Sequence, residues 1–317
     1  MFCGQKNYNL KMFTNFLDKE NTTSMKGVAI LLITISHMGD GFHITTFVSL
    51  GGIGVALFLV LSGYGMMESY KKNGLMGFWK KRLLRVLVPY ILWALFFSAY
   101  QLLVGKNVEL LRYWFVEYIV IWYVVFYLSA RFLPKQQWII FSFLAILLYW
   151  FLPWWKAQQS LSFITGMLIS KYRNSIMKIS MKSFLLIGCL FLLVVMFAFK
   201  IKQWVPIGEE MMIEDVPFVN NWGDNHYLRK LAQIFIKLPI ALFIIIIMEL
   251  LSRYKSKLLY AIGLVSYELY LVQMSFYTSI ECNYQNLILF CLEIVVCSYL
   301  LYKCNKKVTK ILISCQS

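Results

Sequence analysis

The sequence predicts an all-α integral membrane protein with about ten transmembrane helices and both termini in the cytoplasm. Composition, the spacing of apolar runs and the positions of the basic residues all support this class. Hydrophobic residues make up 60% of the 317 residues and the mean hydropathy is +0.66. Charged residues make up only 15%, whereas a soluble domain carries about 25%. An ordinary soluble domain is therefore excluded.

Apolar runs of the length of a membrane-spanning helix recur along the whole chain. Such a helix needs about 20 mainly apolar residues. Ten ranges approach this length: 26–45, 47–67, 86–105, 113–132, 137–154, 157–171, 183–203, 229–251, 257–279 and 284–303. The first is apolar only from Gly27 to Ser36 and the sixth is short. We expect both to lie against protein rather than against free lipid.

The basic residues alternate in the way that ten spans require. With the N-terminus in the cytoplasm, 23 of the 31 Lys and Arg residues fall in cytoplasmic segments and seven in outer segments. This asymmetry follows the positive-inside rule. The net charge of +16 is thus explained by topology, and we expect no nucleic-acid partner.

Three regions follow from this pattern. Residues 1–24 are polar and lack the features of a signal peptide, so we expect a cytoplasmic leader. Residues 25–303 form the transmembrane domain, and residues 304–317 form a basic cytoplasmic tail. The seven cysteines include no Cys-x-x-Cys pair and lie mostly in or beside apolar runs. We therefore expect small hydrophobic roles for them, and no metal site.

One outer loop, residues 203–227, is rich in acidic and aromatic side chains. It contains Glu209, Glu210, Glu214, Asp215, Asp224, Trp204 and Trp222. Carboxylates and tryptophans suit hydroxyl-rich ligands, so this loop is a candidate lid for a sugar. The alternative is an ordinary solvated loop.

His37 and Lys26 are the most informative polar residues of the first predicted span. Ionisable groups inside a membrane are costly and usually mark a functional site or a water-filled cavity. Their spacing of eleven residues is close to three helical turns, so both lie on one face, about 16 Å apart. Lys26 at the cytoplasmic boundary and His37 near mid-membrane suit an anionic substrate that enters from the cytoplasm. The alternative is that His37 only makes a hydrogen bond between packed helices.

A basic cluster precedes the third predicted span. Arg82 and Arg85 lie on one helix face, and Pro89 falls in the first turns, where its missing N–H costs least. The planar guanidinium group binds phosphate in bidentate geometry. The cluster therefore indicates phosphate binding or, alternatively, a topology signal or contact with anionic lipids.

Polar and aromatic side chains recur within three further spans. Small and polar residues there can open a notch between helices, although they fit ordinary helix packing equally well. An intramembrane Glu268 needs a partner. The residues concerned are Ser62, Gly63, Tyr64, Glu117, Trp122, Tyr123, Ser266, Tyr267 and Glu268.

Taken in order, these motifs resemble those of the acyltransferase 3 family of multi-spanning membrane acyltransferases, over residues 25–302. The matching segments are Lys26 with His37, Gly54 to Tyr64, Lys81 to Tyr90, Trp122 to Val124 and Gly263 to Leu271. The chain departs from the family pattern at four positions: Lys26 replaces Arg, Ala56 a frequent Asp, Val88 a Pro and Gln273 a frequent His.

The resemblance implies transfer of an acyl group, usually acetyl, from cytoplasmic acyl-CoA to a hydroxyl group of a cell-envelope or exported glycan. It further implies a bacterial cytoplasmic (inner) membrane. Lys26, Arg82 and Arg85 would bind the CoA phosphates. His37, paired with Lys26, would act as general base or carry the acyl group covalently. The implied substrate-binding residues are Ser62, Tyr64, Glu117, Trp122, Tyr123, Ser266 and Tyr267.

Two other functions remain open at this point. A transporter or flippase of a lipid-linked saccharide would also use a basic inner rim, aromatic side chains and intramembrane polar groups. A membrane-bound sensor or scaffold would tolerate loss of His37. His37 with Lys26 separates these alternatives from the enzyme, because only acyl transfer needs the imidazole.

Overall fold

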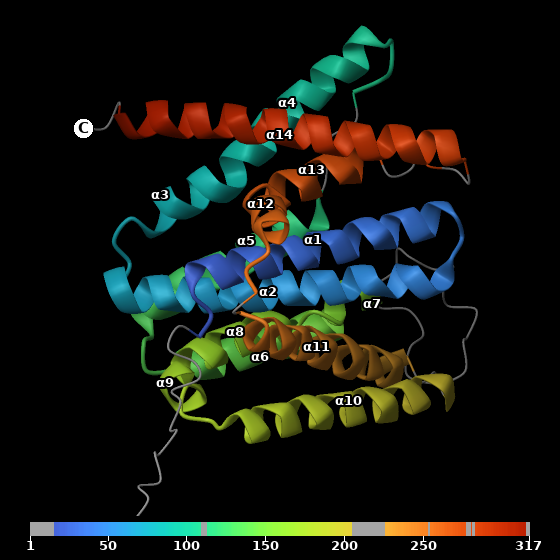
Figure 1. Cartoon of the computed structure of the whole chain (residues 1–317). Helices are drawn as coiled ribbons and strands as arrows, with labels where there is room; N and C mark the ends of the chain where they lie inside the picture. The colour runs from blue at the N-terminus through green and yellow to red at the C-terminus, as the bar shows by residue number, and fades with distance from the viewer. Residues whose placement is uncertain are drawn as a thin grey trace, which may run out of the picture.

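The computed structural model describes residues 16–108, 113–204, 226–252, 254–276, 280 and 283–314, and this part of the chain is helical without strands. Figure 1 shows α1 and α2 side by side in the middle of the molecule. The helices are α1 (Lys19–Gly41), α2 (Thr45–Asn73), α3 (Phe78–Arg82), the π-helix η1 (Leu83–Leu87), α4 (Val88–Leu103), α5 (Trp114–Phe132), α6 (Gln137–Phe151), α7 (Trp154–Ala157), α8 (Ser162–Lys171), α9 (Arg173–Ile176), α10 (Met181–Trp204), α11 (His226–Leu250), α12 (Lys257–Leu264), α13 (Ser266–Phe276) and α14 (Tyr284–Ser314).

Six of these helical segments are long and apolar enough to cross a membrane, and the pair α12–α13, bent by 67°, would be a seventh. The expected count of ten is therefore not confirmed by length and hydropathy in the described residues. Helices do lie in the three other predicted ranges, but α1 is too polar, and α6 and α8 have only 15 and 10 residues. A helix packed inside the protein needs neither the length nor the apolar surface of one that faces lipid.

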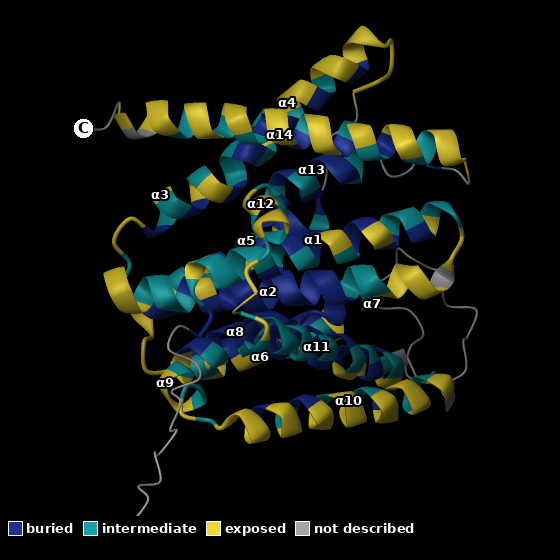
Figure 2. Cartoon of the chain, in the orientation of Figure 1, coloured by how far each residue is buried: buried dark blue, intermediate teal, exposed yellow. Residues whose placement is uncertain are grey.

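The burial of each helix follows its position in the bundle. In Figure 2 the middle of α2 is buried, whereas α10 and α14 are exposed along much of their length. The exposed side chains of these outer helices include large apolar ones, such as Phe197 and Val295. Apolar exposed faces are what a lipid environment requires.

Glycines allow the central helices to approach closely. A Cβ atom at Gly166 of α8 would overlap the Val60 carbonyl oxygen of α2, and one at Gly63 would overlap the Phe163 carbonyl oxygen. Gly27 of α1 and Gly263 of α12 make the same kind of backbone approach. Small residues at such crossings let helix backbones approach closely, which favours helix association in membranes.

Helices extend past both ends of the predicted transmembrane domain, residues 25–303. Asp18 caps α1 by accepting a hydrogen bond from the Asn21 N–H at 2.7 Å, and Phe16 and Leu17 are buried. Helix α1 thus begins inside the segment expected as a leader, residues 1–24. At the other end, α14 continues to Ser314 through most of the expected tail. Most of the acidic outer loop, residues 205–225, lies outside the described residues.

The close approach of α2 and α8 predicts that Gly166→Val destabilises the protein by about 1–3 kcal/mol or more, the usual cost of overpacking. The matched control is Gly65→Ala, because nothing lies within 4 Å of a Cβ atom at Gly65. Thermal unfolding in detergent micelles checks both variants. An unchanged midpoint for Gly166→Val would show that the helices separate without cost.

Candidate functional site

A cavity of about 660 Å³ opens between segments that are distant in the sequence: α1, α2, the α3–η1 segment, α5, the α12–α13 break and α14. Its volume lies within the range of small-molecule and cofactor sites. The residues singled out by the sequence that line it are Lys26, Ser62, Arg82, Arg85, Tyr123, Ser266, Tyr267 and Glu268.

Two irregular stretches of backbone form part of the cavity wall. One is the π-helix η1, which contains Arg85, and the other is the break between α12 and α13 at Val265. The Tyr267 hydroxyl donates a hydrogen bond to the Val86 carbonyl oxygen at 2.9 Å and so joins the two. Ser266 Oγ donates to the Gly263 carbonyl oxygen at 2.9 Å. Within a membrane, irregular backbone persists only where protein or a cavity satisfies its polar groups.

The cavity is strongly positive. It is lined by five cations, Lys26, Lys81, Arg82, Arg85 and Lys306, and by a single carboxylate, that of Glu268. The Glu268 carboxylate accepts a hydrogen bond from Asn305 Nδ2 at 3.1 Å. None of the five cations forms an ion pair with a carboxylate within the described ranges. Uncompensated positive charge in a recess concentrates anions there, so the geometry points to an anionic ligand.

Arg82 has the smallest solvent-exposed fraction of these cations. Only 9% of it is exposed. Its guanidinium carbon lies 5.1 Å from the centre of the Phe78 ring and 5.2 Å from that of Tyr123. Its Nε atom is buried without a hydrogen-bond partner. Two aromatic faces thus hold the guanidinium group in place and leave it able to bind an anion. A buried charge without a bound counter-ion is costly, so this position favours an anionic ligand.

A family model described as an acyltransferase domain matches residues 23–303 of the chain. The chain belongs to this family. The resemblance inferred from the five motifs is confirmed, and membership makes this chain a membrane acyltransferase by family. No curated protein and no solved structure matches the chain.

His37 of the acyltransferase does not line the cavity. It lies on the same continuous helix as Lys26 and is half-buried. At 1.5 Å per residue, the eleven-residue separation places it about 16 Å further along α1. A catalytic role for His37 therefore requires a ligand that extends from the cations of the cavity along α1.

Three other predicted substrate-binding residues also lie outside the cavity lining. The Glu117 side chain is 57% exposed and lies 3.8 Å from the Lys156 ammonium group. Trp122 is fully buried and stacks on Phe163 with ring centres 5.0 Å apart. Tyr64 is buried in the core. In the structure Glu117 thus makes a surface ion pair, and Trp122 and Tyr64 take part in helix packing.

The structure adds residues that the sequence did not single out. Asn305 and Lys306 line the cavity, although both fall in the stretch expected as a basic tail. In the sequence, their position just after an apolar run indicates only a cytoplasmic flank of a span. Seven residues after Ser266 on α13, Gln273 is fully buried and accepts a hydrogen bond from Thr34 Oγ1 at 2.7 Å. Gln273, which replaces a frequent family histidine, thus contacts α1 one turn from His37.

The Tyr267 hydrogen bond predicts a measurable loss of stability in Tyr267→Phe. The variant leaves the Val86 carbonyl oxygen without its partner, which we expect to cost about 0.5–1.5 kcal/mol. Tyr260→Phe is the matched control, because the Tyr260 hydroxyl makes no hydrogen bond to any residue that the structure describes. Thermal unfolding checks the pair. Equal midpoints would mean that the bond contributes nothing to holding α13 against η1.

Proposed function

We propose that this membrane acyltransferase moves an acyl group, acetyl in the simplest case, from cytoplasmic acyl-CoA to a hydroxyl group of a cell-envelope or exopolysaccharide glycan. The observation that carries the proposal is the cavity with five cations and one hydrogen-bonded carboxylate. The phosphates of acyl-CoA are anions of the kind that arginine and lysine bind most strongly. The membrane is the bacterial cytoplasmic membrane, with the cavity facing the cytoplasm in accordance with the positive-inside rule.

Lys26, Arg82 and Arg85 hold the donor in this mechanism. The planar guanidinium groups of Arg82 and Arg85 can each bind a phosphate through two hydrogen bonds. Lys26, at the position where the family has an arginine, provides a single compact positive charge. The three come from α1, α3 and η1 and meet only in the cavity. Binding the phosphates there leaves the acyl arm free to extend along α1 towards His37.

His37 acts on the acceptor. The neutral imidazole takes the proton of the acceptor hydroxyl while the oxygen attacks the thioester carbonyl carbon. The carbon–sulfur bond then breaks, an ester forms, and the CoA thiolate leaves and regains a proton. A covalent acyl-histidine, formed by attack of the imidazole on the same carbonyl, would deliver the acyl group in two steps instead.

One observation favours a second function, transport of a lipid-linked saccharide without acyl transfer. The bent α12–α13 pair resembles the discontinuous helices at the substrate sites of many transporters. A transporter, however, has no chemical need for an imidazole at position 37. The two functions therefore differ in what His37→Ala does.

The decisive experiment compares glycan O-acylation by mass spectrometry in cells that lack the protein and are complemented at matched membrane levels. We expect wild type to restore an ester mass and His37→Ala to lower the rate by about 10²–10⁴-fold, the usual contribution of a general base. Arg82→Ala is expected to raise the KM for acyl-CoA by about 10- to 100-fold, because a charge-assisted contact is lost.

Lys80→Ala is the matched control for the arginine variant. Lys80 is exposed on the same short helix and lines neither the cavity nor the hollow beside it. Full activity of His37→Ala would overturn the catalytic assignment. Altered glycan export without any ester mass would favour the transporter.

A further inference from the structure

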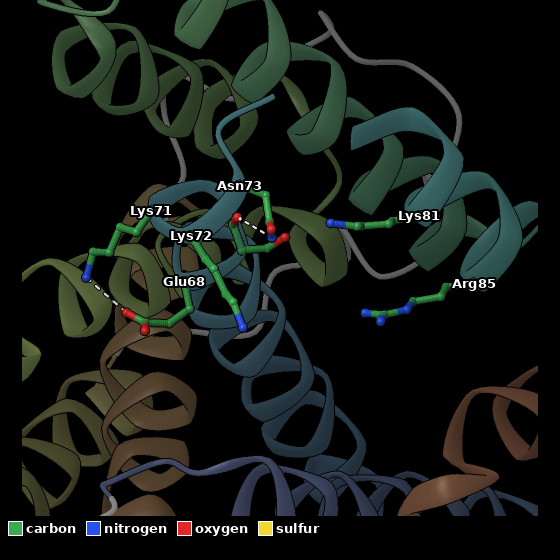
Figure 3. A pocket seen from close by; sticks show the side chains of 7 residues that line it. Glu68, Lys71, Lys72, Asn73, Lys81 and Arg85 are labelled. Atoms are coloured by element: carbon green, nitrogen blue, oxygen red, sulfur yellow. Dashed lines mark hydrogen bonds and ion pairs between the residues drawn. The ribbon is translucent and has the colours of Figure 1, made fainter. Parts of the chain in front are cut away.

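An open hollow of about 530 Å³ adjoins the cavity (Figure 3). Two of its lining residues, Lys81 and Arg85, also line the cavity, so the two recesses share a wall. Lys72 reaches the hollow from the end of α2, opposite Lys81 and Arg85 from the α3–η1 segment.

The short connection between α2 and α3 brings these cations face to face. Gly74 and Gly77 adopt positive φ angles of 55° and 61°. Glycine adopts this left-handed conformation without steric cost, so the chain can reverse within a few residues. The reversal places the basic end of α2 against the basic start of the next span.

The single carboxylate of the hollow is already occupied. Glu68 pairs with Lys71 at 2.9 Å, accepts a hydrogen bond from Ser170 Oγ at 2.6 Å, and lies 3.9 Å from the Arg173 guanidinium. Lys72, Lys81 and Arg85 have no carboxylate partner within the part of the chain that the structure describes. Of the four cations that line the hollow, Lys71 is paired with Glu68, so three remain without a carboxylate partner among the described residues.

We propose that the hollow is a second phosphate subsite, which binds the 3′-phosphate of CoA while the diphosphate lies at the shared wall and the acyl arm enters the cavity. This rests on the proposed function, because it assumes an acyl-CoA donor. A ligand with two separated phosphate groups accounts for two adjoining positive recesses, which one phosphate would not require. A phosphomonoester carries close to two negative charges at neutral pH, so it gains from Lys72 in addition to the shared wall of Lys81 and Arg85.

The test compares CoA with 3′-dephospho-CoA, which lacks only the phosphate in question. Affinities are measured by calorimetry on the full-length protein in phosphatidylcholine nanodiscs, where no anionic lipid competes. We expect Lys72→Gln to weaken CoA binding by about three- to tenfold, the effect of one partly exposed charge pair, and to leave dephospho-CoA binding unchanged. Lys80→Gln, the matched control, should change neither affinity.

Each other outcome overturns a defined part of the proposal. If Lys72→Gln weakens both nucleotides equally or neither, the subsite is wrong while the donor assignment stands. If wild type binds neither nucleotide, the donor assignment fails and the subsite fails with it. Native mass spectrometry of the protein in phosphatidylglycerol nanodiscs measures whether the hollow binds a lipid headgroup instead. Loss of bound lipid in Lys72→Gln, with CoA affinity unchanged, would make the hollow a lipid headgroup site instead.

Discussion

Close backbone contact between α1 and α12 is the constraint on which the candidate site depends. A Cβ atom at Gly27 would overlap the Leu259 carbonyl oxygen, and one at Gly263 would overlap the Thr23 carbonyl oxygen. Lys26 directly precedes the first of these glycines, and the break at Val265 lies two residues after the second. The same crossing therefore brings the cation of α1 and the opened backbone of α12–α13 to one cavity.

The site has a cost in stability that the surrounding structure must offset. Several cations face one recess without ion pairs among the described residues, and the backbone is irregular on two sides. Hydrogen bonds and aromatic faces offset part of this cost, as with Tyr267 on Val86 and the two rings around Arg82. Such local departures from ideal packing and charge pairing are typical of functional sites. A bound polyanion would stabilise the cavity by neutralising it.

The long apolar helices show where sequence reasoning works best. Apolar runs for α2, α5, α10, α11 and α14 are recognisable without a structure, because a helix that crosses a membrane needs about 20 mainly apolar residues. The number of spans is harder to predict from the sequence, because α1 and α8 lie against protein and need not be apolar over a full membrane thickness. Burial by neighbouring helices, which no local window of sequence records, decides their character.

The sequence by itself determined the class, the family and the types of residue from which a site could be built. The charge pattern and the order of the motifs were enough for these inferences, because both can be read directly along the chain. Only the tertiary structure decided that Arg82, Lys26 and Lys306 share one recess, while Glu117, Trp122 and His37 do not line it. The physical reason is that the recess is formed by helix crossings and by two breaks in helical geometry. These bring together residues that are distant in the sequence, such as Gly27 with Gly263 and Val86 with Tyr267.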